Sequence, residues 1–161
     1  MDSCKGIIIK TSYDKMGSVG NIGILGKTML EWVSLSLCDM SYECIDNDEE
    51  QSLPLLIRGC LDTSKEYTVV LYSDTPLITR KTISEAVETA RLNDLNVMRM
   101  TRGFVFKTDY IATAEKIYTD KTYYFDEDDF VTAYSFKQVS FISDVLKGRI
   151  LTYHMNRGVQ F

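Results

Sequence analysis

One carboxylate directly follows a predicted central strand, at the position where open α/β sheets bind their ligands. The segment 67–72 is continuous, apolar and β-branched, which predicts a buried strand at the centre of a mostly parallel sheet. Asp74 follows it directly, in the sequence Asp74-Thr-Pro-Leu77. In open α/β sheets the carboxyl ends of the strands border the ligand crevice, and a carboxylate there can hold a divalent cation against phosphate oxygens. The alternative is that Asp74 only caps the turn before Pro76.

Segments that resemble strands and helices alternate around this position. Short β-branched runs predict strands, and apolar residues at helical spacing predict helices. Thr82 and Glu85 have the spacing of a capping box, which places a helix start at Thr82. The expected strands are 6–10, 42–45, 67–72, 96–100, 103–106 and 121–125, and the expected helices are 28–40, 53–61, 82–93, 109–118 and 136–156. This alternation predicts one domain over residues 1–161, a three-layer, Rossmann-like α/β sandwich with a long C-terminal helix at about 136–156.

Composition excludes several classes of protein. The 161 residues carry 18 basic and 23 acidic side chains, a net charge of −5, which argues against a nucleic-acid partner. No stretch approaches the roughly 20 apolar residues of a membrane span, and no signal peptide is recognisable, so no membrane partner is expected. Four cysteines at irregular spacings and one histidine do not predict a zinc site, and reduced thiols favour a cytoplasmic protein. The acidic run at 126–129 is predicted to be a solvated loop or the acidic segment before a helix, and the alternative is a site for a cation or a basic partner.

Four segments, in the same order along the chain, resemble the sugar-phosphate nucleotidyltransferases. Asp74-Thr-Pro-Leu77 is similar to the family motif Gly-Asp-x-Pro-Leu, and the segment 6–9, Gly-Ile-Ile-Ile, to the family's first strand. The segment 26–33, Gly-Lys-Thr-Met-Leu-Glu-Trp-Val, resembles Gly-Lys-x-Met-Leu-x-x-Val. The segment 149–159 resembles the linker helix Arg-Ile-Asn-x-x-His-Met-x-x-Gly-Val of the bacterial N-acetylglucosamine-1-phosphate uridyltransferases, whose N-terminal domain is the nearest likeness. The resemblance implies a reduced fold of the nucleotide-diphospho-sugar transferase type, with Asp74 as a magnesium ligand.

The chain departs from this family where the family binds its nucleotide. The family's glycine-rich loop Leu-Ala-Ala-Gly-x-Gly-Thr-Arg-Met lets backbone N–H groups approach phosphates, but residues 8–16 contain no glycine, and Tyr13 and Asp14 would crowd and repel a triphosphate. By alignment, Val19 stands at the family's catalytic lysine and Tyr134 at the asparagine that is its second metal ligand. The stretch between residues 77 and 101, which in the family binds the amino sugar, is short. The remaining weak candidates for cofactor contacts are Lys10, Lys15 and Lys27.

These departures predict a non-catalytic, nucleotidyltransferase-like protein with no cofactor. Such a pseudoenzyme would act through protein–protein contacts, as a regulatory, scaffolding or assembly protein, for example one encoded by a phage or another mobile element. The alternative is a sugar-phosphate nucleotidyltransferase or nucleotide-sugar binder that uses Mg²⁺ at Asp74. In the resembled enzyme the final helix leads to a second domain, which this sequence does not include. Apolar residues left over on the helix are therefore expected to bind a protein partner or a second copy, and the expected interface is Leu151, Tyr153, Met155, Val159 and Phe161.

Overall fold

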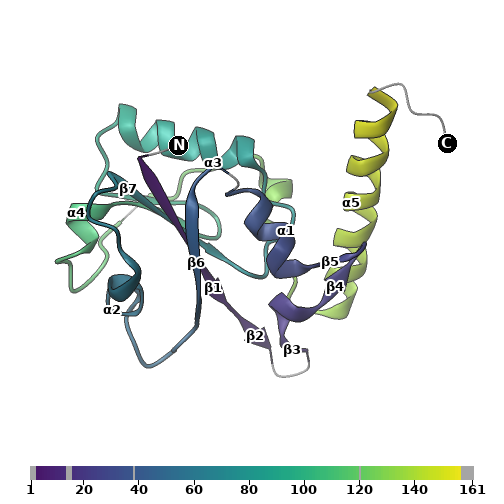
Figure 1. Ribbon diagram of the computed structural model, residues 1–161, viewed down its shortest axis with the longest axis horizontal. Helices are drawn as coiled ribbons and strands as arrows, with labels where there is room; N and C mark the ends of the chain where they lie inside the picture. The colour runs from purple at the N-terminus through teal and green to yellow at the C-terminus, as the bar shows by residue number, and fades with distance from the viewer. Residues whose placement is uncertain (1–2, 14–15, 38, 120, 157–161) are drawn as a thin grey trace.

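A five-stranded, mostly parallel sheet forms the centre of the computed structural model, which describes residues 3–13, 16–37, 39–119 and 121–156, with side chains up to residue 152 (Figure 1). The strand order is β6-β1-β7-β9-β8, so β7 lies in the middle, as expected. The strands β6 and β7 pair in parallel with β1, whereas β9 pairs antiparallel with both β7 and β8. Four of the five strands thus run in one direction. Their bounds are β1 Cys4–Lys10, β6 Ser41–Asp46, β7 Tyr67–Tyr72, β8 Val97–Arg99 and β9 Phe104–Lys107.

Helices cover both faces of this sheet. The apolar run of β7 is continuous because its side chains are buried on both faces. Val69 and Leu71 belong to the core cluster under α1 and α3, whereas Val70 belongs to the cluster under α2 and α4. A strand that is buried on both faces has no polar face to alternate with, so the prediction of a three-layer, Rossmann-like sandwich is confirmed. The helix bounds are α1 Met29–Leu35, α2 Leu53–Ile57, α3 Arg80–Leu92 and α4 Thr108–Ile111.

The long helix α5 (Phe136–Asn156) has the predicted bounds and stands at one edge of the molecule (Figure 1). Ile142 and Leu146 pack in a third core cluster with Val19, Met29 and Leu77. The segment after β1, expected as a loop, forms short ribbons that help to build this cluster. They are β2 Ser12–Tyr13, β3 Gly17–Ser18, β4 Gly23–Ile24 and β5 Lys27–Thr28, with the short helix η1 at Val19–Asn21.

Two predicted helix boundaries were wrong because side-chain hydrogen bonds compete with the helical pattern. The helix predicted at 28–40 ends at Leu35, and the Ser36 hydroxyl turns back to donate to the Val33 carbonyl. The helix predicted to start at Thr82 starts at Arg80, because Thr79 is its N-cap and accepts from the backbone N–H of Thr82.

Further predictions failed in the segment between β9 and α5. The helix predicted at 109–118 is only the four-residue α4, and the strand predicted at 121–125 is reduced to one bridge between Arg99 and Thr122. Tyrosine-rich sequence has strand propensity, but the segment 121–125 packs beside the sheet instead of extending it. Elsewhere in the chain, before β7, the predicted helix at 53–61 is divided into α2 and the short helix η2 (Arg58–Cys60).

A buried carboxylate ties α5 to the body of the fold, although its acidic run was predicted to be solvated. Asp129, in the short helix η3 (Glu127–Phe130), is 1% exposed. Its Oδ2 accepts from the hydroxyls of Thr79 at 2.8 Å and Thr82 at 2.6 Å, and its Oδ1 accepts from Arg149 Nη2 at 3.0 Å. Arg149 Nη1 also donates to the Leu77 carbonyl at 2.6 Å. The helix is therefore fixed by hydrogen bonds as well as by apolar packing.

We expect Gly103→Ala to destabilise the fold strongly. Gly103 has φ +122°, and a Cβ added there would lie 2.6 Å from the Val70 carbonyl oxygen, so both backbone strain and a clash with β7 follow. The expected loss in the free energy of unfolding is about 3 kcal/mol, measured by urea denaturation. Gly23→Ala is the control, because a Cβ there meets nothing within 4 Å. Equal stability of the two variants would contradict the close approach of β9 to β7.

Candidate functional site

Asp74 lies just beyond the carboxyl end of β7, and its side chain is 0% exposed. Its Oδ2 accepts a hydrogen bond from the Tyr13 hydroxyl at 2.7 Å and another from Arg102 Nη2 at 2.8 Å. Its Oδ1 accepts from Arg102 Nε at 3.3 Å. The guanidinium therefore donates two parallel hydrogen bonds to the carboxylate, which is the strongest common geometry for such a pair. Sequence reasoning placed Asp74 at the crevice but missed Arg102 as its partner.

The tight turn between β8 and β9 positions Arg102. The Met100 N–H donates to the Gly103 carbonyl at 3.0 Å across this turn. The guanidinium also lies over the Tyr72 ring, with its central carbon 3.9 Å from the ring centroid, which adds a cation–π attraction. In the antiparallel register Val70 pairs with Phe104, so continuing it by two residues puts Arg102 opposite Tyr72.

The strand β2 brings Tyr13 to the same carboxylate from the other side. The chain leaves β1 beside the end of β7, and the Thr11 N–H donates to the Ser73 hydroxyl at 2.9 Å. A further backbone bond, from the Ala133 N–H to the Asp74 carbonyl at 2.8 Å, attaches the segment before α5. Side chains of the chain itself therefore cover Asp74 at the carboxyl end of β7, whereas a pocket of about 310 Å³ stays open at the carboxyl ends of β1 and β6.

The charges in this cluster support one another. Burial, followed by the hydrogen bond to Asp74, raises the pKa of Tyr13 from 10 to about 12. Burial alone would lower the pKa of Arg102, but the hydrogen bonds and negative charge of Asp74 outweigh it and raise that pKa. At neutral pH the Arg102 guanidinium is therefore a cation and the Tyr13 phenol is neutral.

The donor set around Asp74 does not fit a magnesium ion. Mg²⁺ requires about six oxygen ligands in octahedral geometry. Arg102 and Tyr13, which contact this carboxylate, instead donate hydrogen bonds to it. Among the described residues, no group of three or more His, Cys, Asp or Glu side chains could hold a metal ion. The cation that faces Asp74 here is a guanidinium.

The other residues singled out from the sequence lie elsewhere. Lys10 forms an ion pair with Asp46 at 3.4 Å, Lys27 is exposed in β5, and Lys15 lies outside the described residues. Val19, at the position of the family's catalytic lysine, is fully buried in the core cluster under α5. These positions stay candidates on sequence grounds alone.

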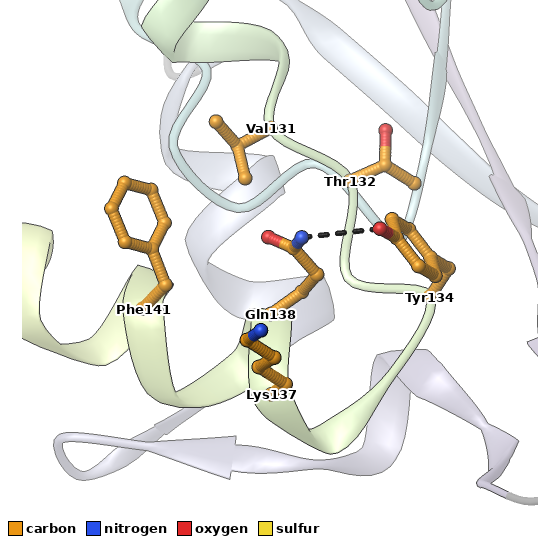
Figure 2. Close-up of a pocket in the computed structure, with 6 residues that line it drawn as sticks. All are labelled: Val131, Thr132, Tyr134, Lys137, Gln138 and Phe141. Carbon is orange, nitrogen blue, oxygen red and sulfur yellow. Dashed lines mark hydrogen bonds between the residues drawn. The ribbon is translucent and has the colours of Figure 1, made fainter.

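Tyr134 follows a residue that contacts Asp74, but its own side chain binds elsewhere. The N–H of its neighbour Ala133 donates to the Asp74 carbonyl oxygen. The Tyr134 hydroxyl, however, accepts from Gln138 Nε2 at 3.2 Å (Figure 2). This pair lines a groove of about 530 Å³ beside α5, together with Val131, Thr132, Lys137 and Phe141.

Exposed apolar side chains gather on α5 and on the residues that lead into it. Of the predicted interface residues, Leu151 is described and is 45% exposed. The side chains of Tyr153 and Met155, and all of Val159 and Phe161, lie outside the described part. The structure adds residues that the sequence reasoning did not select: Tyr134, Phe136, Phe141 and Ile150 are also exposed. Tyr134 precedes the helix, and Ile150 was expected on its core stripe with Val139, Ile142, Leu146 and Tyr153, but is 37% exposed.

Comparison with known proteins finds no matching family model and no matching curated protein. Among solved structures, the Rv0371c homologue from Mycobacterium sp. strain JC1 is 12% identical, with a TM-score of 0.63 over 90% of this chain and 98% of that one. Rv0371c from Mycobacterium tuberculosis H37Rv is 9% identical, with a TM-score of 0.62 over 89% and 98%. CMP:2-keto-3-deoxy-manno-octonic acid synthetase complexed with CTP is 13% identical, with a TM-score of 0.47 over 62% and 52%.

At these identities the likeness concerns the fold alone. The reduced, mostly parallel α/β sandwich that the sequence predicts is confirmed, whereas its likeness to the nucleotidyltransferases, and to the uridyltransferase in particular, stays a prediction. Within the described residues, no helix combines the length and the apolar character that a membrane crossing requires.

The raised pKa of Tyr13 predicts a stability difference that depends on pH. A proton held more tightly in the folded state stabilises the fold below the unfolded pKa of 10, and this contribution is lost as pH rises toward about 12. Tyr13→Phe should therefore lower the free energy of unfolding by about 1–2 kcal/mol at pH 7, since a hydrogen bond to a buried carboxylate is lost. The gap to the wild type should narrow as pH rises from 10 to about 12. Urea denaturation from pH 7 to 12 measures this, and a constant gap would disprove the coupling.

Proposed function

We propose that this chain is a non-catalytic, nucleotidyltransferase-like protein that acts through protein contacts made by α5. The observation that carries the proposal is where the exposed apolar side chains lie. Of the twelve large hydrophobic residues that are exposed in the described part of the chain, five fall between positions 134 and 151: Tyr134, Phe136, Phe141, Ile150 and Leu151. A concentration of this kind on one helix and the residues that lead into it is typical of an interaction surface, whereas single exposed apolar residues are ordinary.

A second copy of the chain is the partner that the charges favour. The protein carries a net charge of −5, so most of its surface repels another copy. On α5, by contrast, Arg149 is paired with Asp129, and the other described charged side chains are two basic residues, Lys137 and Lys147, and one acidic residue, Asp144. This helix combines apolar area with a locally positive balance of charge, and both properties suit contact with an acidic neighbour of the same sequence.

The covered Asp74 carboxylate supports the non-catalytic half of the proposal. A nucleotidyltransferase must bring phosphate oxygens and a cation to Asp74, but Arg102 and Tyr13 already occupy both carboxylate oxygens. The glycine loop of the family is also replaced by residues 11–16, from which Tyr13 closes the site. The alternative, a nucleotidyltransferase or nucleotide-sugar binder with Mg²⁺ at Asp74, requires Arg102 and Tyr13 to leave that carboxylate.

The catalytic alternative is tested directly by pyrophosphate release. With UTP, N-acetylglucosamine-1-phosphate and Mg²⁺, we expect no release above background, because the cation and the triphosphate have no open place at Asp74. Release that requires both substrates and disappears in Asp74→Ala would establish the alternative.

Self-association is tested with two matched variants. Leu151 on α5 is 45% exposed and Leu92 on α3 is 76% exposed, so neither supports the monomer's core. We expect Leu151→Glu to weaken self-association roughly 10-fold to 100-fold, the loss of about 1.5–3 kcal/mol for one buried leucine, and Leu92→Glu to leave it unchanged. Sedimentation velocity over a range of protein concentrations measures the association constant. A wild type that stays monomeric throughout, or equal effects of the two variants, would contradict the assignment of α5.

A further inference from the structure

The Arg102 side chain supplies the cation that faces Asp74. It faces a carboxylate at the carboxyl end of a central strand, and it brings one positive charge to two carboxylate oxygens. The carboxylate has no exposure to water, so its negative charge depends on this neighbour for compensation. We propose that Arg102 is a built-in cation that replaces a divalent metal ion at Asp74, so that the crevice is charge-balanced without metal.

The geometry of the guanidinium distinguishes this role from that of a surface ion pair. Arg102 contacts both oxygens of Asp74 and stacks on Tyr72 with 3.9 Å to the ring centroid, and its own side chain is 33% exposed. A lysine would supply the charge without the planar fork or the stacking. The Tyr13 hydroxyl completes the set by donating to Oδ2, the oxygen that also binds Nη2.

The backbone holds Arg102 in this place independently of the ion pair. The next residue, Gly103, approaches the Val70 carbonyl so closely that no side chain fits there. The register between β7 and β9 then directs Arg102 toward Tyr72 and Asp74. The sheet itself thus positions the Arg102 guanidinium beside Asp74, as a permanent part of the fold.

The inference makes an unusual prediction about a loss-of-charge variant. If Arg102 stands in for a metal ion, its removal should leave a buried carboxylate that recruits a divalent cation. Wild-type protein should show no shift in melting temperature with millimolar Mn²⁺, whereas Arg102→Met should melt roughly 10 °C lower without metal. Added Mn²⁺ should raise the melting temperature of Arg102→Met, because a ligand bound only by the folded state stabilises it.

A double variant shows whether the carboxylate is responsible. In Arg102→Met/Asp74→Asn the buried charge is gone, so part of the lost melting temperature should return without metal, and Mn²⁺ should have no effect. Arg91→Met is the matched control. Arg91 also pairs with a carboxylate, Glu88 at 3.4 Å, and lies over a tyrosine ring, Tyr67 at 5.6 Å, but away from the crevice on α3. It should neither gain a response to Mn²⁺ nor lose much stability.

Direct binding of Mn²⁺, followed by its electron paramagnetic resonance signal, supplies the second measurement. A wild type that binds Mn²⁺ through Asp74 would overturn the proposal, as would an Arg102→Met protein that folds but does not respond to Mn²⁺. If Arg102→Met does not fold, Arg102→Gln keeps a hydrogen-bond donor without the charge and is read in the same way. Failure of both variants to fold even with Mn²⁺ would also overturn the proposal. These results are independent of self-association by α5, since neither residue lies on that helix.

Discussion

The structure depends on one buried ion pair at the edge of the sheet. Asp74 has no contact with water, and Arg102 and Tyr13 meet it from segments that are far apart in the sequence. Removal of the Arg102 charge would leave the fully buried Asp74 carboxylate uncompensated in a medium of low dielectric constant, so breaking the pair on that side is far more costly than lacking it altogether. The turn between β8 and β9, the end of β7 and the strand β2 therefore hold together as one unit. The same contacts that stabilise this end of the sheet also cover the Asp74 carboxylate.

The sequence was sufficient for those features that follow from local pattern. The apolar run of β7 and the spacing of apolar residues in α5 predicted both elements with correct bounds, because burial on two faces and burial of one stripe leave distinct signatures. The failures lie where a distant side chain decides. Thr82 has the spacing of a capping residue, yet its hydroxyl donates to Asp129, 47 positions away, and Thr79 caps the helix instead. No local pattern carries that information.

The candidate site shows the same division between local and distant determinants. Asp74 could be recognised because a carboxylate directly after a central strand has a fixed place in an open sheet. Arg102 could be recognised only once β9 is known to run antiparallel to β7, since that direction brings the start of β9 beside the end of β7. A prediction of parallel strands throughout would send Arg102 to the opposite edge. Arg102 could therefore not be identified as the partner of Asp74 without the direction of β9, although an arginine is a suitable partner for a carboxylate.

A second buried aspartate links the crevice to the C-terminal helix. Arg149 binds Asp129 and also donates to the Leu77 carbonyl, three residues after Asp74, while the Ala133 N–H binds the Asp74 carbonyl. The short segment from Asp74 to Thr79 is therefore held at one end by Arg102 and at the other by the helix that carries the exposed apolar surface. Arg149 therefore joins the helix to this segment through hydrogen bonds from both of its terminal nitrogens. The exposed apolar surface of α5 and the Asp74 carboxylate are thus attached to the same short segment of chain, although their side chains serve different purposes.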